Sequence, residues 1–139
     1  MNIYIVGQDP SEVDILASYV GLGGIVVRKV YDIRALLNLL LTSTRPDWVV
    51  FYNDSPVPKN GDTKLWEQVS GDTSDEFRRQ TMVAITKWLA EKEVKVLYIY
   101  NSNNQRVGSA RMENVGAYVL PDLSRMDELH KRIRSVIRV

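Results

Sequence analysis

The 139-residue sequence is long enough to form one domain with a hydrophobic core of its own. Its 18 lysines and arginines nearly balance its 17 aspartates and glutamates, which excludes a whole-molecule field that would attract nucleic acid or an anionic membrane. The sequence has no cysteine, which excludes disulfides, a thiol nucleophile and thiolate metal ligands.

The chain begins with an apolar run that is too short for a signal peptide or a membrane span. This run covers residues 2–6, and no basic segment precedes it. We therefore expect a soluble, cytoplasmic protein that does not associate with a membrane. The run instead predicts the first strand of a sheet.

The first half of the chain alternates β-rich apolar runs with helical patterns. Asp9 before Pro10 predicts a helix start, because an aspartate caps the free amides of the first turn and a proline fits the first helical position. This helix is expected to end at a glycine-rich segment that begins with Gly21, and Asp32 predicts the start of a second helix. The predicted strands here are residues 2–6, 25–30 and 48–52.

The second half of the chain starts with a polar, turn-rich connection over about residues 55–74, longer than most connections in compact domains. Thr73 and Glu76 then form a capping-box pattern that predicts a helix. A weak helix precedes the fifth strand, and Ser124 with Asp127 predicts the start of the last helix. The predicted strands here are residues 94–100 and 117–120.

The order and composition of these elements predict the fold class. Strands that alternate with helices and are apolar almost throughout indicate a parallel sheet covered by helices on both faces. We therefore expect an α/β protein, a three-layer α/β/α sandwich around a five-stranded parallel sheet. The expected strand order is the flavodoxin-like 2-1-3-4-5, and residues 1–139 are expected to form a single domain.

Three segments of the sequence are similar to motifs of response-regulator receiver domains. Residues 6–10 (VGQDP) lie where receivers carry an acidic pair after the first strand. Residues 45–61 (RPDWVVFYNDSPVPKNG) resemble the segment whose aspartate accepts a phosphoryl group, and residues 115–121 (VGAYVLP) resemble the segment around the fifth strand. The resemblance implies the flavodoxin-like receiver fold and a role in signalling or regulation.

The groups that a receiver uses for phosphoryl transfer are replaced in this sequence. The resemblance places Gly7 and Gln8 at the acidic pair that holds Mg²⁺. It places Tyr52 at the phosphoacceptor and Tyr100 at the Thr or Ser after the fourth strand, and residues 116–121 contain no lysine. We therefore expect a pseudo-receiver with no catalytic residue, no metal and no cofactor.

An alternative alignment, shifted by two residues, makes Asp54 the phosphoacceptor. Asp9 and Asp54 would then form a minimal metal site at the carboxyl edge of the sheet. A two-residue shift along a strand moves the acceptor by roughly 6.6 Å. The competing interpretation is that Asp54 only forms the turn before Pro56.

A second alternative is a small-ligand or nucleotide-binding protein or enzyme of the flavodoxin-like fold. Its site would lie at the carboxyl edge, where open α/β sheets bind their ligands. Familiar phosphate-binding motifs do not support it, because residues 21–24 follow a helix instead of preceding one. His130, the only histidine, is expected to be exposed and not a general base. The residues around this site would be Asp9, Asp54, Ser102 and Asn103.

Four further residues are candidate contacts for a partner or ligand. Trp66, in the long connection, is expected either to fold back as a lid over the vacated pocket or to anchor a partner. Tyr118 resembles the aromatic residue that moves when receivers switch, on the face through which receivers dimerise or dock. Lys131 and Arg134 share one side of the last helix, where they either form a solvated face or contact a partner.

The expected function is therefore non-catalytic and independent of phosphorylation, in protein–protein interaction or regulation. The resemblance implies a protein partner, and a homodimer is one form that such an interaction takes. Nucleic acid is the weaker alternative, because no aromatic residue lies among the basic residues of the last helix.

Overall fold

The computed structural model describes residues 1–21, 23–52, 59, 61–73, 77, 81–101, 108–122 and 125–138. Five parallel strands form one sheet in the order β2-β1-β3-β4-β5, which confirms the predicted order. Each strand begins and ends within one residue of its predicted bounds. The strands are β1 (Asn2–Val6), β2 (Val26–Val30), β3 (Trp48–Tyr52), β4 (Lys95–Tyr100) and β5 (Tyr118–Pro121).

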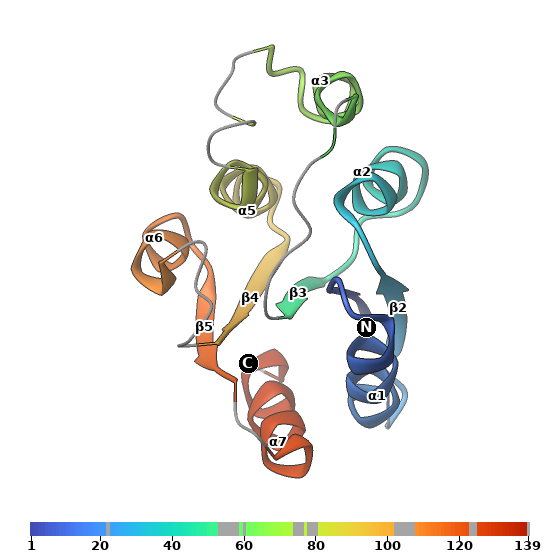
Figure 1. Cartoon of the computed structure of the whole chain (residues 1–139), viewed down its shortest axis with the longest axis vertical. Helices are drawn as coiled ribbons and strands as arrows, with labels where there is room; N and C mark the ends of the chain where they lie inside the picture. The colour runs from blue at the N-terminus through green and yellow to red at the C-terminus, as the bar shows by residue number, and fades with distance from the viewer. Residues whose placement is uncertain are drawn as a thin grey trace.

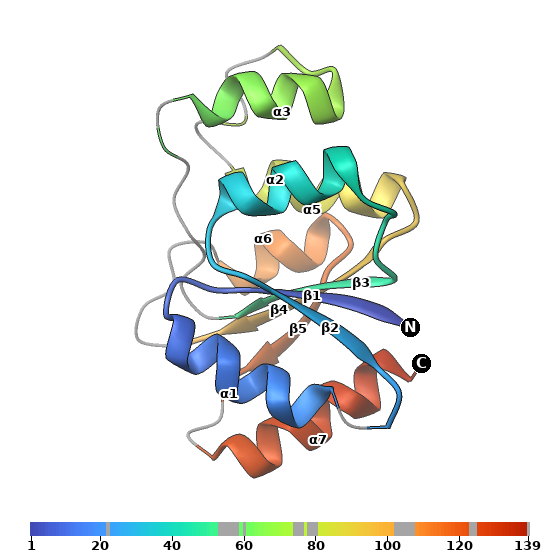
Figure 2. The same ribbon diagram turned by 90° about the vertical axis from the view of Figure 1, so that its right-hand side faces the viewer.

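Helices cover both faces of the sheet (Figures 1 and 2), which confirms the predicted α/β/α fold class. On one face, α1 (Pro10–Val20) and α7 (Met126–Ile137) lie side by side. The other face carries α2 (Ile33–Thr42), α5 (Thr81–Glu91) and α6 (Ser109–Asn114). None of the helices in the described ranges is long and apolar enough to cross a membrane.

Side-chain alternation along β3 divides the core into two halves. All residues of this strand are buried. Val49 and Phe51 join the core on the side of α2 and α5, whereas Val50 and Tyr52 join the core on the side of α1 and α7. A central strand of a parallel sheet is apolar throughout for this reason, since helices cover both of its faces.

Aspartate caps set the starts of α1 and α2, as predicted. Asp9 accepts hydrogen bonds from two backbone amides of the first turn of α1, and α1 ends at Gly21. Asp32 caps α2 in the same way. The other two predicted helix starts are not tested in full, because Glu76 of the pair with Thr73, and Ser124 of the pair with Asp127, lie outside the described residues.

The predicted connection over residues 55–74 contains a helix, α3 (Asp62–Ser70). This helix lies outside α2 and α5 and is the helix farthest from the sheet (Figure 2). Gly61 and Gly71 flank it in the left-handed conformation, with φ of 99° and 76°. The spacing of Leu65, Trp66 and Val69 fits one turn of a helix, but the polar, turn-forming residues around them predict a connection, and α3 is longer than that one turn.

A buried carboxylate holds α3 against α2. Asp62, the first residue of α3, accepts a hydrogen bond from Arg34 Nε at 3.2 Å and another from the Lys59 amide at 2.6 Å. The Asp62 side chain is buried, whereas Arg34, on α2, is more than half exposed. Hydrogen bonds that involve a charged group are stronger than neutral ones, so this contact fixes the amino end of α3.

An aromatic cluster fixes the middle of α3. Trp66 has only 2% of its surface exposed. Its ring stacks on Phe77 with the centroids 5.0 Å apart and meets Trp88 of α5 edge-on at 6.0 Å. Aromatic pairs in these geometries stabilise a fold by about 0.5–1.5 kcal/mol beyond the burial of their surface.

Candidate functional site at the carboxyl edge of the sheet

The carboxyl ends of β1 and β3 bring two of the predicted site residues together. Gly7 follows β1 and Tyr52 ends β3, and the two strands are paired up to Val6 and Phe51. A Cβ atom on Gly7 would lie 3.7 Å from Cβ of Tyr52. The two positions are therefore neighbours.

Gly7 leaves no room for a side chain. Its amide donates a hydrogen bond to the Val30 carbonyl at 3.0 Å. A Cβ atom at this position would lie only 2.7 Å from Cγ2 of Val13, which is buried on α1. A valine in a helix has one strongly preferred rotamer, so Val13 cannot turn aside without strain. A carboxylate at position 7, which the sequence lacks, would therefore fit only if Val13 or α1 shifted.

Tyr52 and Tyr100 do not share a pocket, which corrects the predicted grouping of these two residues. Tyr52 is 5% exposed and lies in the core against α1 and α7, where its neighbour on β4 is Ile99. Tyr100 packs on the other half of the core and stacks on Tyr98 with the ring centroids 6.4 Å apart. Successive residues of a strand point to opposite faces, and Tyr100 is one residue out of phase with Tyr52.

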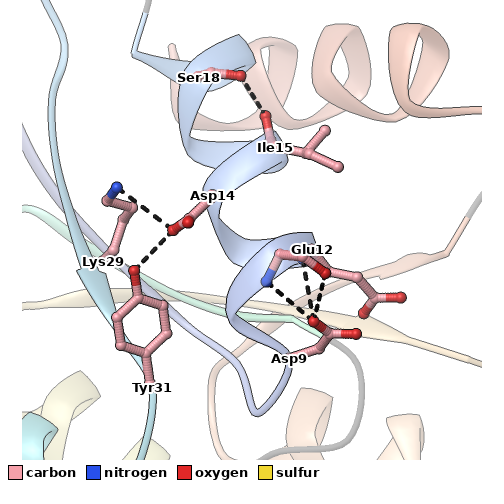
Figure 3. A network of polar contacts seen from close by, with 8 residues as sticks. Asp9, Glu12, Asp14, Ile15, Ser18, Lys29 and Tyr31 are labelled. Atoms are coloured by element: carbon pink, nitrogen blue, oxygen red, sulfur yellow. Dashed lines mark hydrogen bonds and ion pairs between the residues drawn. The ribbon is translucent and has the colours of Figure 1, made fainter.

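Gln8 and Asp9 are exposed in the turn between β1 and α1. Asp9 Oδ1 accepts hydrogen bonds from the Ser11 hydroxyl at 2.7 Å and the Ser11 amide at 3.0 Å (Figure 3). The Ser11 hydroxyl is the main cause of a lowered pKa at Asp9; slight desolvation opposes it, and the Glu12 and Ser11 amides add to it. Asp9 is thus an ionised helix cap whose contacts serve α1.

Three of the predicted site residues lie outside the described residues, namely Asp54, Ser102 and Asn103. Asp54 as a phosphoacceptor and the small-ligand site therefore both stay predictions. Among the residues that the structure describes, no group of three or more His, Cys, Asp or Glu side chains could hold a metal ion.

Trp66 lies away from this edge of the sheet. Its ring packs in the helical layer against Phe77 and Trp88, and its indole Nε1 is buried with no hydrogen-bond partner among the described residues. A side chain in this position contacts the protein's own helices. The predictions that Trp66 roofs the pocket or anchors a partner at the surface are therefore corrected.

Tyr118, Lys131 and Arg134 lie at other surfaces, and the structure does not bring them to Gly7 and Tyr52. Tyr118 begins β5, is 47% exposed and contacts Trp48 with the ring centroids 5.4 Å apart. Lys131 is exposed on α7. The Arg134 guanidinium lies over the turn that follows α1, since a Cβ atom on Gly23 would be 2.8 Å from it.

His130 is half-buried, not exposed as predicted. Its ring stacks on Tyr19 of α1 with the centroids 4.8 Å apart, and its Nδ1 lies 3.1 Å from the Met126 carbonyl oxygen. No local pattern pairs Tyr19 with His130, because they meet only where α1 and α7 pack together.

A polar network that sequence reasoning missed joins α1 to the edge strand β2 (Figure 3). The Tyr31 hydroxyl donates a hydrogen bond to Asp14 Oδ1 at 2.7 Å, and Lys29 Nζ lies 3.4 Å from the same oxygen. The hydrogen bond between Tyr31 and Asp14 is the main cause of the lowered pKa of Asp14 and the raised pKa of Tyr31. The network is exposed, and its contacts fix α1 on β2.

Comparisons with known proteins identify the fold. No protein-family model and no curated protein matches the sequence. Among solved structures, the signal receiver domain of a DNA-binding response regulator from Colwellia psychrerythraea is 16% identical, with a TM-score of 0.66 over 100% of this chain and 99% of that one. A response regulator from Thermotoga maritima is 12% identical, with a TM-score of 0.65 over 99% and 98% of the two chains. The response regulator domain of Thermotoga maritima CheB is 10% identical, with a TM-score of 0.66 over 99% and 93%. The chain therefore has the flavodoxin-like fold of response-regulator receiver domains.

Proposed function

We propose that this protein is a regulatory module of receiver fold that acts through protein–protein contacts and without phosphorylation. One observation carries the proposal, and it concerns the ends of β1 and β3. Gly7 stands where a receiver has a carboxylate after its first strand, and a side chain there would overlap the buried Val13. Tyr52, where the resemblance places the phosphoacceptor, is buried in the core.

Phosphoryl transfer by a receiver depends on negative charge at this edge of the sheet. Carboxylates hold a Mg²⁺ ion that neutralises the phosphoryl oxygens, and a further carboxylate is the nucleophile. In this chain Gly7 supplies no ligand, Gln8 is a neutral amide and Asp9 caps α1. The proposal is supported by these replacements together, since each removes a different part of the same chemistry.

Incubation of the purified chain with a small acyl phosphate and Mg²⁺ tests the proposal. Intact-mass spectrometry is expected to show no added phosphoryl group, while a phosphorylatable receiver domain in the same buffer gains one. Asp54→Asn is the matched variant, because the alternative alignment makes Asp54 the acceptor. A phosphoryl group that is stable on the wild-type chain and missing from Asp54→Asn would overturn the proposal.

A regulatory module that carries out no chemistry acts by binding, so we propose a protein partner, with a second copy of the chain as one candidate. Light scattering coupled to size-exclusion chromatography over a hundredfold range of concentration separates the two cases. A mass that rises to twice that of the chain indicates self-association. A constant monomer mass excludes self-association over this range, and the proposed partner is then a different protein.

A further inference from the structure

The last two turns of α7 present a basic surface. Lys131, Arg134 and Arg138 follow one another at spacings of three and four residues, which places them along one side of the helix. They line a shallow hollow of about 480 Å³ together with His130 and Ser135, and none of the described residues that line it is acidic. At a rise of about 1.5 Å per residue, the three cations extend over roughly 10 Å of the helix.

The positive charge of this surface is not neutralised within the described residues. No carboxylate there forms an ion pair with Lys131, Arg134 or Arg138. The acidic residues of α7, Asp127 and Glu128, precede Lys131 by four and three residues, and their ion pairs are with Arg125, at 3.2 and 3.9 Å. The helix dipole favours cations only in the last turn, so it does not explain Lys131.

Exposed apolar side chains border the basic surface on α1. Tyr19 is 37% exposed and stacks on His130, while Ile15, one turn earlier on α1, is 49% exposed. Figure 3 shows Ile15 pointing to the opposite side of α1 from Asp14, away from the network with Lys29. Tyr19 joins these side chains to the basic surface, because it contacts His130, which also lines the hollow; Ile15 lies one turn nearer the start of α1. We call the exposed residues Ile15 and Tyr19 of α1, with Lys131, Arg134 and Arg138 of α7, the basic–apolar face.

The composition of the basic–apolar face decides between two kinds of anionic partner. Affinity for nucleic acid comes mainly from contacts of Lys and Arg with phosphates, and it grows with the number of phosphates neutralised, whereas this face offers only three cations. A phosphate backbone would also leave Ile15 and Tyr19 uncovered. A helix with carboxylates three and four residues apart and an adjacent apolar stripe matches both the charges and the apolar side chains.

We propose that the basic–apolar face is the docking site for an acidic amphipathic helix of a partner protein. The carboxylates of that helix pair with Lys131, Arg134 and Arg138, and its apolar stripe covers Ile15 and Tyr19. This inference rests on the proposed function as a protein-interaction module and names the surface and the chemistry of its partner.

The probe is a synthetic helical peptide of about 18 residues, cross-linked to stay helical, with glutamates three and four residues apart beside a leucine stripe. Titration of the full chain, followed by the shifts of its backbone amide signals in NMR spectra, gives both the affinity and the site. We expect the shifts to gather at residues 15–24 and 130–138. Binding is expected to weaken severalfold as the salt concentration rises from about 50 to 300 mM, because the charges are exposed.

Variants of the basic and the apolar parts of the face separate the contribution of charge to peptide binding from that of apolar contact. Lys131→Glu/Arg134→Glu is expected to weaken peptide binding at least tenfold, and Tyr19→Ala about fivefold. Lys87→Glu/Arg111→Glu is the matched control, because it makes the same change in net charge at exposed residues of α5 and α6, across the sheet. This control is expected to bind within twofold of the wild type. Lys131→Glu/Arg138→Glu, which changes two exposed residues, replaces the first variant if that variant does not fold.

Five results would overturn the inference. They are no binding of the peptide, amide shifts at another surface, equal binding of a scrambled peptide of the same composition, an equal loss in the control variant, and tighter binding of a duplex oligonucleotide through the same residues. A sixth such result is self-association that light scattering detects in the wild type and that Lys131→Glu/Arg134→Glu abolishes, which would assign the face to a second copy. If these tests fail and the chain takes up no phosphoryl group, only the docking site is rejected. If the chain is phosphorylated and still binds the peptide, only the proposed function is rejected.

Discussion

Gly7 couples the end of β1 to α1 and to β3. Its missing side chain lets the Val13 side chain fill the space beside the Tyr52 backbone, whose carbonyl oxygen would lie 3.4 Å from a Cβ atom on Gly7. Close packing of this kind transmits any added volume to its neighbours. Replacing Gly7 with aspartate would therefore not restore a receiver pocket, because the chain's own core occupies the position.

Gly7→Ser is expected to destabilise the fold by about 1–3 kcal/mol, because its Cβ atom would overlap Val13. Urea denaturation followed by circular dichroism measures the change. Gly108→Ser is the matched control, since a Cβ atom there meets nothing within 4 Å and serine is a good helix cap. In a Val13→Ala background, Gly7→Ser is expected to cost less than it does in the wild type, because the overlapping methyl group is gone. Equal stability of Gly7→Ser and Gly108→Ser would contradict this account of the edge.

Asp9 is expected to make the stability of the fold depend on acid pH. Its pKa is lowered from the ordinary 3.8, mainly by the Ser11 hydroxyl, so its contribution is complete above that value and is lost as the pH falls through the lowered folded-state pKa. Asp9→Asn keeps a good cap but does not titrate. The urea midpoint of the wild type should fall more steeply than that of Asp9→Asn between about pH 5 and pH 2. Parallel curves of urea midpoint against pH for the two proteins would refute the contribution of Asp9 to this pH dependence.

Among the elements, α3 is the one whose position depends most on a few contacts. It lies outside the layer of α2 and α5, and Asp62 joins it to Arg34 while Trp66 joins it to Trp88. A helix of nine residues is too short to be stable alone in water. The contacts of Asp62 and Trp66, together with the packing of Leu65 and Val69 on the core, therefore set the stability of α3.

Arg34→Ala is expected to free the amino end of α3 by removing a charged partner from the buried Asp62 carboxylate. We expect the free energy of opening α3 to fall by about 1–2 kcal/mol. This loss is smaller than for a fully buried pair, because Arg34 is more than half exposed. Hydrogen exchange should accelerate at the amides of α3 and stay unchanged in β1 and β3. Arg28→Ala, on the edge strand β2, is the control, since Arg28 is exposed and forms no ion pair among the described residues. Equal protection of the α3 amides against exchange in both variants would show that the contact between Arg34 and Asp62 does not hold α3.

Across the whole molecule, the sheet was predictable because its signals are local. Apolar runs and the caps at Asp9 and Asp32 lie within a few residues of the elements that they define. The candidate site was predictable only in part, because it depends on the register between strands. Pairing of β3 with β4 sets Ile99 beside Tyr52 and turns Tyr100 to the other face. Contacts between distant helices, such as that of Tyr19 with His130, have no counterpart along the sequence.

A thermal-shift screen with nucleotides and flavins tests the whole molecule for the small-ligand alternative, and we expect no rise in the melting temperature. The described part of the carboxyl edge offers no vacant ligand group, because Val13 fills the space at Gly7, Tyr52 is buried and Asp9 caps α1. A ligand at about 100 times its dissociation constant would add roughly 2.7 kcal/mol and raise the melting temperature by roughly 8–10 °C, well above the noise of the method. Asp9→Asn/Asp54→Asn is the matched variant. A rise in the wild type that this variant abolishes would place a ligand at the carboxyl edge and refute a purely protein-binding role.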